Sequence, residues 1–227
     1  MLKAIYHKKL HTMNINFCFS INLTEQQQSQ KPYITGRARL DNHQELINAL
    51  KPQDPSALET ILTAYLKWGE ACLDKLYGDF AFVVYSPQKN ELFAARDQIG
   101  IKPFFYHYSN HNFSVSTSQK SLIEVPEVTK KIDDDKVIRY LNYHPTSEDE
   151  TFYKNIYRLP PAHKLSIKNG NLKVDRYWEM QKQDTLKLPL NDSLEYYKEE
   201  LSRAVRVRLP DNGILACELS GGLDSSA

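Results

Sequence analysis

The sequence predicts an α+β protein, in which a domain of paired antiparallel strands and helices is followed by the opening of a parallel α/β domain. Three observations support this prediction. A helix signal lies near residues 56–68, pairs of apolar runs joined by polar turns follow it, and a long helical pattern beyond residue 191 leads into an apolar run and a glycine pair.

The first helix is predicted by Ser56-Ala57-Leu58-Glu59, which has the spacing of a capping box, and by apolar residues that follow at helical spacing up to Leu66. Gly69 comes directly after Trp68. Glycine at this position is typical of a helix end because it adopts left-handed backbone angles without strain. We therefore expect a helix from about residue 57 to residue 68.

Three pairs of short apolar runs predict antiparallel hairpins, because a polar turn separates the two members of each pair. The pairs are 80–85 with 91–95, 104–108 with 113–117, and 164–167 with 172–177. The third pair has the strongest turn signal, Asn169-Gly170. Between the second and third pairs, residues 133–141 predict a short helix that begins with three aspartates, whose charge suits a helix N-terminus.

The C-terminal part begins with a polar, aperiodic stretch over residues 181–191, which we predict to be a linker. A long helix is expected after it, capped by Asn191, Asp192 or Ser193. Its apolar stripe consists of Leu194, Tyr197, Leu201, Val205 and Leu209. The run Ile214–Leu219 then has the composition of a buried strand in a parallel sheet.

Composition excludes several classes of protein. The 29 basic and 28 acidic residues give a formal net charge of +1, which is not the basic excess of a nucleic-acid-binding protein. No apolar run approaches the roughly 20 residues that span a bilayer. Cys18, Cys72 and Cys217 are too scattered for a disulfide framework or a zinc site, and the seven histidines show no metal-ligand spacing. We expect a cytoplasmic protein with reduced thiols, bound neither to nucleic acid nor to a membrane.

The string Ser220-Gly221-Gly222-Leu223-Asp224-Ser225-Ser226 is the strongest chemical signal. Glycines that follow a buried strand let the backbone approach an anion, and the amides of a following helix start favour negative charge. The serines supply hydroxyl donors, and Asp224 is a candidate magnesium ligand. A glycine pair alone is more often a simple turn, but the whole string predicts a phosphate site. The spacing is not that of a Walker A loop.

This string resembles the pyrophosphate-binding loop of ATP-pyrophosphatases, in the form that the motif has in the asparagine synthetase family. Other segments resemble the glutaminase half of the same family. They are Leu76–Phe82, Ala95–Tyr106, Arg158–His163 and Arg176–Trp178. Together the resemblance covers roughly residues 33–227, with the motifs in the family's order.

The resemblance implies an N-terminal-nucleophile-type, four-layer α/β/β/α domain over residues 1–180, of the type-2 glutamine amidotransferase kind. A linker over 181–191 and the truncated beginning of an asparagine synthase domain over 192–227, the start of a parallel α/β ATP-pyrophosphatase domain, would follow. The implied ATP- and pyrophosphate-binding residues are Leu219, Ser220, Gly221, Gly222, Leu223, Asp224, Ser225 and Ser226, with Asp224 also holding magnesium.

The implied reaction is the adenylation of a carboxylate, that of aspartate in the family, followed by attack of ammonia. ATP and magnesium are the implied cofactors. The expected partners are small-molecule substrates: ATP, aspartate or another carboxylate, and ammonia or glutamine. The sequence leaves open whether the protein forms a homodimer. The sequence also leaves open whether the chain is a true truncation or a partial sequence.

The chain departs from the family at the glutaminase site. The family nucleophile is an N-terminal cysteine whose own α-amino group is the base, whereas residue 2 is Leu2 and Cys18 lies mid-chain. We expect Cys18 to be a core residue. The family's Asn-Gly-Glu loop is replaced by Thr35–Asn42, where Arg37 and Arg39 are expected to be solvated strand residues rather than a binding patch.

Asp97 matches the family aspartate that contacts the glutamine amino group. Its alternative role is to pair with Arg96 or to cap the turn at Gly100, and the missing nucleophile favours this alternative. We therefore expect a degenerate glutaminase half. Three hypotheses follow: a fragment of an asparagine synthetase-type amidoligase, a lactam-forming or lasso-peptide-cyclising relative with a structural N-terminal domain, and a non-catalytic remnant.

Overall fold

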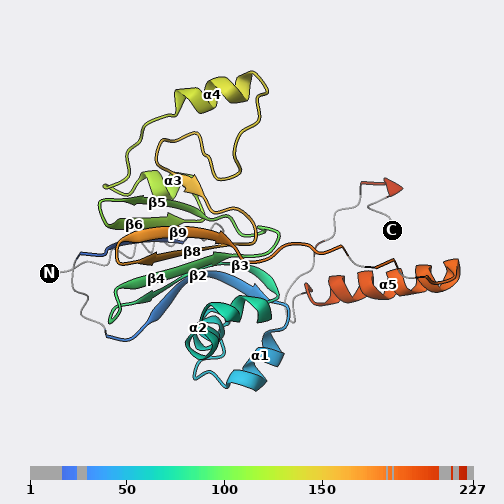
Figure 1. Cartoon of the computed structure of the whole chain (residues 1–227). Helices are drawn as coiled ribbons and strands as arrows, with labels where there is room; N and C mark the ends of the chain where they lie inside the picture. The colour runs from blue at the N-terminus through green and yellow to red at the C-terminus, as the bar shows by residue number, and fades with distance from the viewer. Residues whose placement is uncertain are drawn as a thin grey trace. The chain divides into compact units, whose positions relative to one another are not determined.

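The structure, a computed structural model, describes residues 17–24, 30–182, 184–185, 187–209, 216 and 220–223. The chain divides into two compact units, Met1–Met180 and Gln181–Ala227, and each is described by itself. The strands and the larger hydrophobic clusters lie in the first unit (Figure 1).

Two antiparallel sheets form the centre of the first unit. Sheet B has the order β2-β3-β4-β8-β9, with strands Tyr33–Leu40, Gly78–Ser86, Glu91–Arg96, His163–Lys168 and Asn171–Arg176. Sheet A has the order β1-β6-β5-β7, with strands Cys18–Asn22, Asn112–Ser116, Phe105–Ser109 and Tyr157–Arg158. The three hairpins predicted from sequence are therefore β3–β4, β5–β6 and β8–β9, and all three are confirmed.

Strand β3 is buried on both faces, which explains its uninterrupted apolar sequence. Ala81, Val83 and Tyr85 belong to the core cluster shared with sheet A. The alternate residues Phe80, Phe82 and Val84 belong to a second cluster shared with helices. Because successive side chains of a strand point to opposite faces, β3 places one apolar row in each layer interface.

The first unit has four layers. The cluster between the sheets takes residues from β1, β3, β4, β5, β6 and β8. The helices α1 (His43–Leu50) and α2 (Ala57–Trp68) and the 3₁₀ helix η1 (Gly69–Lys75) cover the other face of sheet B. Helix α3 (Gln119–Ile123) lies on the outer face of sheet A through Leu122. The α/β/β/α order of an N-terminal-nucleophile-type domain, predicted from sequence, is confirmed (Figure 1).

Helix α2 begins and ends where the sequence predicts. The Ser56 hydroxyl accepts a hydrogen bond from the Glu59 N–H at 3.4 Å, and Gly69 at the C-cap has a φ of 61°. The capping box is only half formed, however. The Ser56 N–H donates to the Asp54 carboxylate at 3.0 Å rather than to Glu59, because Asp54 lies in the preceding turn and is closer.

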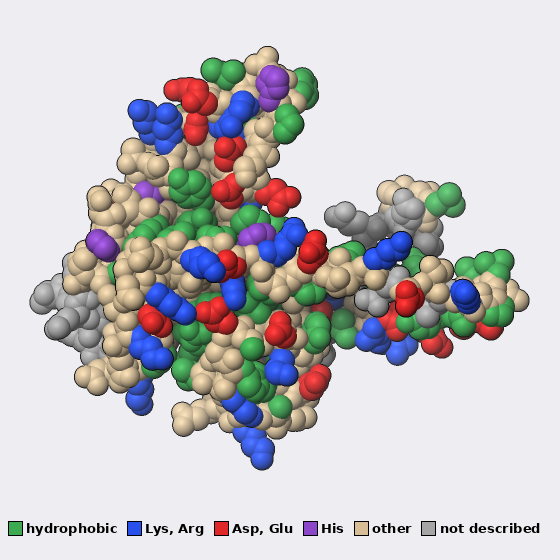
Figure 2. All heavy atoms as spheres, viewed as in Figure 1, with side chains coloured by type: hydrophobic (Ala, Val, Ile, Leu, Met, Phe, Trp, Pro, Cys, Tyr) green, Lys and Arg blue, Asp and Glu red, His purple; other side chains and the backbone are tan. Residues whose placement is uncertain are grey.

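Helix α4 (Asp134–Leu141) lies on an excursion away from both sheets (Figure 1). It begins as expected, with the Asp133 carboxylate capping the Lys136 N–H at 3.2 Å. Glu150 forms ion pairs with Lys136 and Arg139 and so ties the helix to the returning segment. Hydrophobic side chains gather at the outer end of the excursion (Figure 2), where Ile138, Tyr140, Leu141 and Tyr143 are exposed.

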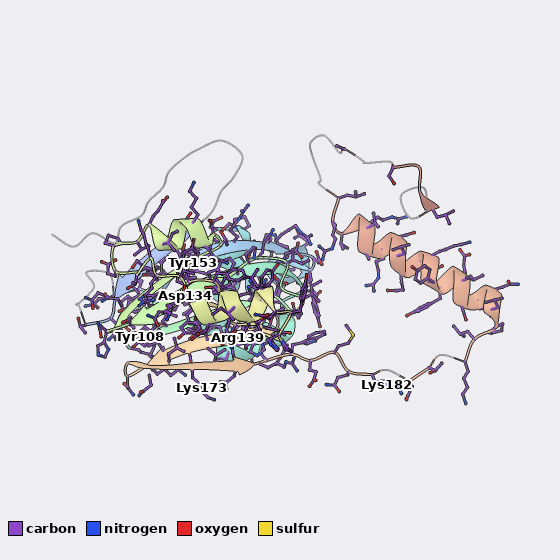
Figure 3. All side chains as sticks on the ribbon, turned by 90° about the horizontal axis from the view of Figure 1, so that it is seen from above. Tyr108, Asp134, Arg139, Tyr153, Lys173 and Lys182 are labelled. Carbon is purple, nitrogen blue, oxygen red and sulfur yellow. The ribbon has the colours of Figure 1, made fainter. Side chains whose placement is uncertain are left out.

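The β8–β9 turn joins the two sheets at one end. Asn169 and Gly170 have φ values of 52° and 74°, the left-handed pair typical of a tight hairpin. The Tyr108 hydroxyl of β5 donates to the Gly170 carbonyl at 2.7 Å, and Figure 3 shows Tyr108 at this end of the unit. The turn of one sheet is thus held by a side chain of the other.

The second unit contains helix α5 (Leu190–Arg206), which has no buried residue. The cap predicted at Asn191, Asp192 or Ser193 is wrong. The helix starts earlier, with Pro189 as N-cap, because the Pro189 carbonyl already accepts from both the N–H and the hydroxyl of Ser193 at 3.0 Å. Among the described residues, no helix is both long and apolar enough to cross a membrane.

Candidate functional site

Asp97 lies immediately after β4 and is fully buried. Its carboxylate accepts three backbone hydrogen bonds, from Phe80 at 3.3 Å, Ile101 at 2.8 Å and Lys102 at 2.9 Å. The turn closes further because the Gly100 N–H donates to the Asp97 carbonyl at 3.1 Å. Asp97 therefore holds together the turn that connects β4 to β5. The hydrogen-bond donors to its carboxylate are backbone N–H groups of the same unit.

Gly100 is required by this turn. Its φ is +71°, in the left-handed region, and a Cβ there would lie 2.8 Å from the Pro161 ring and 3.0 Å from the Arg96 guanidinium. The Gly100 carbonyl in turn accepts from that guanidinium at 2.6 Å. A side chain at this position would displace the group that holds the turn closed.

Arg96 is buried next to Asp97 but binds elsewhere. Besides Gly100, its guanidinium donates to the carbonyls of Lys102 at 2.7 Å and Leu159 at 2.8 Å. Burial lowers the pKa of this guanidinium, and the Asp97 charge acts in the opposite direction. Among the ion pairs of the described residues, none joins Arg96 to Asp97. Of the two alternatives for Asp97, capping the turn is the one that the structure shows.

The position of Cys18 differs from that of the N-terminal nucleophile that the family resemblance implies. Cys18 opens β1, opposite Ser116 of β6, and its nitrogen is a peptide amide. Its thiol reaches the Ser121 carbonyl of α3 at 3.8 Å, and burial raises its pKa. The prediction that Cys18 is a core residue is wrong in part. Phe19 enters the core between the sheets, so the side chain of Cys18, its neighbour on the strand, faces the outer layer.

The strand β2 occupies the region of the missing Asn-Gly-Glu loop. Arg37 is exposed there, as expected. Arg39 instead forms ion pairs with Asp41 at 2.6 Å and with Asp79 at 3.4 Å. These residues fasten the end of β2 to the start of β3. They do not form a free cationic patch.

The glycine loop is described only over Ser220–Leu223. Gly221 has a φ of +79°, and the Gly222 N–H donates to the Ser220 hydroxyl at 3.4 Å. These residues are exposed, and nothing lies within 4 Å of a Cβ placed on Gly221. Leu219, Asp224, Ser225 and Ser226 lie outside the described residues, as does Ile214–Leu219 except Ala216.

Two polar side chains, the partly buried Tyr177 and the buried His107, were missed by sequence reasoning. Tyr177 donates its hydroxyl to the Arg96 carbonyl at 2.8 Å. His107 is 3% exposed and its Nδ1 lies 2.7 Å from the Asn155 carbonyl, while its Nε2 has no hydrogen-bond partner among the described residues. Neither has a local sequence signal, because both partners are distant in the chain. Within the described ranges, no three metal-binding side chains come together.

Comparison with known proteins identifies the family to which this fold belongs. Residues 24–178 match the family model described as a glutamine amidotransferase domain. This segment contains β2–β9, the Asp97 turn and the helices of both outer layers. The chain therefore belongs to the glutamine amidotransferase domain family.

Curated relatives identify the branch of the family. The chain is 32% identical over 173 residues to asparagine synthetase [glutamine-hydrolyzing] 3 of Bacillus subtilis, across 76% of this chain and 28% of that protein. It is 30% identical over 182 residues to a putative asparagine synthetase of Methanocaldococcus jannaschii, across 78% of this chain and 35% of that protein. The resemblance to the asparagine synthetase family is thereby confirmed. The chain spans about a third or less of these relatives' length.

Among solved structures, the chain is similar to the glutamine phosphoribosylpyrophosphate amidotransferase of Bacillus subtilis. The identity is 17%, the TM-score is 0.47, and the match covers 67% of this chain and 30% of that one.

Proposed function

We propose that this chain is part of an ATP-dependent amidoligase of the asparagine synthetase type. The observation that carries the proposal is the order of features along one chain. An amidotransferase domain over residues 24–178 is followed by a polar connection, an amphipathic helix and the string Ser220–Ser226. In this proposal the glycine string binds the pyrophosphate portion of ATP, and the reaction takes place inside the cell, in the cytoplasm.

The proposed reaction makes a carboxylate reactive toward an amine. A carboxylate is a poor electrophile, so its oxygen attacks the α-phosphorus of ATP, pyrophosphate leaves, and an acyl-adenylate forms. Ammonia or an amine then displaces AMP and forms the amide. Backbone amides and serine hydroxyls of the glycine string would stabilise the charge that builds on the departing pyrophosphate.

The described part of the string fits an anion. Gly221 adopts the left-handed angle that glycine tolerates, and no side chain crowds it. Magnesium, when bound to the phosphates through Asp224, would neutralise part of their charge. The contributions of Leu219 and of Asp224–Ser226 belong to the proposal.

The amidotransferase unit is proposed not to hydrolyse glutamine. Two contacts support this. The Cys18 nitrogen is an amide and its thiol is directed to Ser121, and the Asp97 carboxylate is buried and already accepts three N–H groups. Three of the roughly four acceptor positions of this buried carboxylate are thus occupied, which leaves little room for the amino group of glutamine. The nitrogen source is therefore free ammonia or an amine of a second substrate.

The glutaminase prediction is tested with the 227-residue chain. Glutamine should yield no ammonia or glutamate above a blank, and Cys18→Ala should change nothing. A release of glutamate that Cys18→Ala abolishes would overturn this part of the proposal. Cys72→Ala is the matched control, because Cys72 is buried in the helix-facing core and its pKa is raised to about 12 by burial.

The ligase prediction is tested with a longer protein that contains this chain. ATP should be converted to AMP and pyrophosphate, and Asp224→Ala should lower turnover by about 100-fold or more. ADP as the product, or full activity of the Asp224→Ala protein, would contradict the assignment.

For the 227-residue chain we expect weak ATP binding, since α5 buries no residue and so gives the loop little support. Micromolar affinity in titration calorimetry would contradict that expectation.

A lactam-forming or peptide-cyclising ligase is the second candidate. The observation that favours it is an amidotransferase unit with an intact core in which, among the described residues, the Cys18 thiol lies against the Ser121 carbonyl. Such a unit is structural, and the attacking amine belongs to the substrate. Aspartate- and ammonia-dependent AMP formation supports asparagine synthesis, whereas AMP formation that needs an amine-bearing carboxylate supports cyclisation. A protein that forms no AMP with either is a remnant.

A further inference from the structure

Tyr177 is the residue that follows β9, and it is anchored at both its backbone and its side chain. Its N–H donates to the Ala162 carbonyl at 2.8 Å, and its hydroxyl donates to the Arg96 carbonyl at 2.8 Å. The ring packs against the core between sheet B and the helices. Burial, and then the nearby Asp97 carboxylate, raise the pKa of the phenol, so it remains a donor at neutral pH.

Both partners of Tyr177 belong to the Asp97 turn. Arg96 precedes Asp97 and holds the turn through three carbonyls. Ala162 donates its own N–H to the Asp97 carbonyl at 3.0 Å. The backbone of Asp97 is thus linked to Tyr177 on two sides, once through Ala162 and once through Arg96.

Tyr177 also marks the point where the chain leaves the first unit. The next residues, Trp178 to Met180, are exposed, and the second unit begins at Gln181. Lys182, labelled in Figure 3, lies on the extended segment that follows. The two hydrogen bonds of Tyr177 therefore lie at the start of this exposed segment.

We propose that Tyr177 is a latch that couples the Asp97 turn to the exit of the chain from the amidotransferase unit. When the two hydrogen bonds of Tyr177 are formed, the Asp97 turn and the exit segment open as one cooperative unit. Because thermodynamic coupling is reciprocal, loosening the turn loosens the exit, and releasing the exit loosens the turn. This coupling does not require catalytic activity in the first unit. Its tests are therefore independent of the proposed ligase reaction.

The first test is amide hydrogen exchange on the full chain with Tyr177→Phe, which removes one hydroxyl and keeps the ring. Loss of this partly buried hydrogen bond should speed exchange of the Gly100, Ile101, Lys102 and Ala162 amides about threefold to tenfold. Tyr108→Phe is the matched control, because Tyr108 also donates to a backbone carbonyl, that of Gly170, at 2.7 Å. It should speed exchange near the β8–β9 turn and leave the Asp97 turn unchanged.

The second test runs the coupling in reverse. Asp97→Asn should speed exchange of the Tyr177 amide and cleavage by a protease after residues 178–182. A third measurement needs no variant: in the wild-type chain the amides of Ile101, Lys102, Ala162 and Tyr177 should share one opening free energy and one denaturant dependence. Different dependences, unchanged exchange at the turn in Tyr177→Phe, or equal acceleration of all amides would each overturn the latch.

Discussion

The two charged residues of the Arg96–Asp97 pair are satisfied by backbone groups. A buried carboxylate is costly unless it is hydrogen-bonded, and Asp97 receives three N–H donors. A guanidinium carries five donors in a fixed fork, and Arg96 uses them on three carbonyls of the 100–102 and 159 segments. At the residue scale, Arg96 and Asp97 hold the turn between β4 and β5 closed.

We expect Asp97→Asn to destabilise the first unit by about 2–4 kcal/mol. The change replaces one acceptor oxygen by an amide nitrogen that faces backbone donors, and it leaves buried N–H groups unpaired. The measurement is the urea unfolding midpoint followed by circular dichroism. Asp175→Asn is the control: its ion pair with Lys173 is exposed, so its loss should leave the unfolding midpoint almost unchanged. A cost below about 1 kcal/mol at Asp97 would contradict the capping role.

At the scale of elements, strand β2 depends on a close approach at Gly36. A Cβ on Gly36 would lie 2.3 Å from the Ala81 carbonyl and 2.6 Å from the Phe82 Cα, both of them backbone atoms of β3. The φ of +149° adds strain for any other residue. Gly36 is therefore needed for the pairing of β2 with β3.

We expect Gly36→Ala to destabilise the fold by about 3 kcal/mol or more, since neither backbone atom can move without breaking the β2–β3 ladder. Chemical denaturation, or the soluble folded fraction if the variant is too unstable, measures the effect. Thr35→Ala, on the same strand, should cost about 1 kcal/mol or less. Similar values for the two variants would show that the approach is not tight.

A second element-scale contact joins η1 to β8 through Glu70, which pairs with Lys164 at 2.7 Å and with Lys168 at 3.2 Å. The hydrogen bond from Lys164 is the main reason that the pKa of Glu70 is lowered from its usual 4.5. A lowered carboxyl pKa contributes stability above pH 4.5, and this contribution is lost as the pH falls through the lowered value.

We therefore expect wild-type chain to lose more stability than Glu70→Gln between pH 5 and pH 3. The difference should be under about 1 kcal/mol, because the pair is partly exposed and solvent screens it. Denaturant unfolding at each pH measures it. Glu127→Gln, at an exposed position, should follow the wild-type pH dependence. Parallel curves for wild type and Glu70→Gln would contradict the contact.

At the scale of the whole molecule, stability belongs to the first unit. The three hydrophobic clusters take their buried residues from positions 19–167, and α5 buries none. We expect residues 1–180 expressed alone to keep the unfolding free energy of the full chain within about 0.5 kcal/mol. Equilibrium denaturation of both proteins is the measurement. A loss of more than about 2 kcal/mol would show that the second unit stabilises the first.

Local patterns predicted the elements that are defined by their own residues. The α2 helix, the α4 helix and three hairpins follow from capping residues, apolar spacing and turn residues. Strand β1, the bounds of the edge strand β2 and the short helices were not predicted, and the start of α5 was predicted wrongly. Their limits depend on partners such as β3, β6 and the Pro189 carbonyl, which are fixed by pairing and not by local composition.

By itself, the sequence determined the family and the fold class, because these depend on residue types in a fixed order. The role of the glycine string stays a prediction. Only the tertiary structure decided what Asp97, Arg96 and Tyr177 do. Their hydrogen-bond partners are 4 to 81 positions away in the chain, and no local pattern places such groups together. Burial then decides the chemistry: a carboxylate surrounded by backbone donors closes a turn, and the same residue facing solvent would be free to bind an amine.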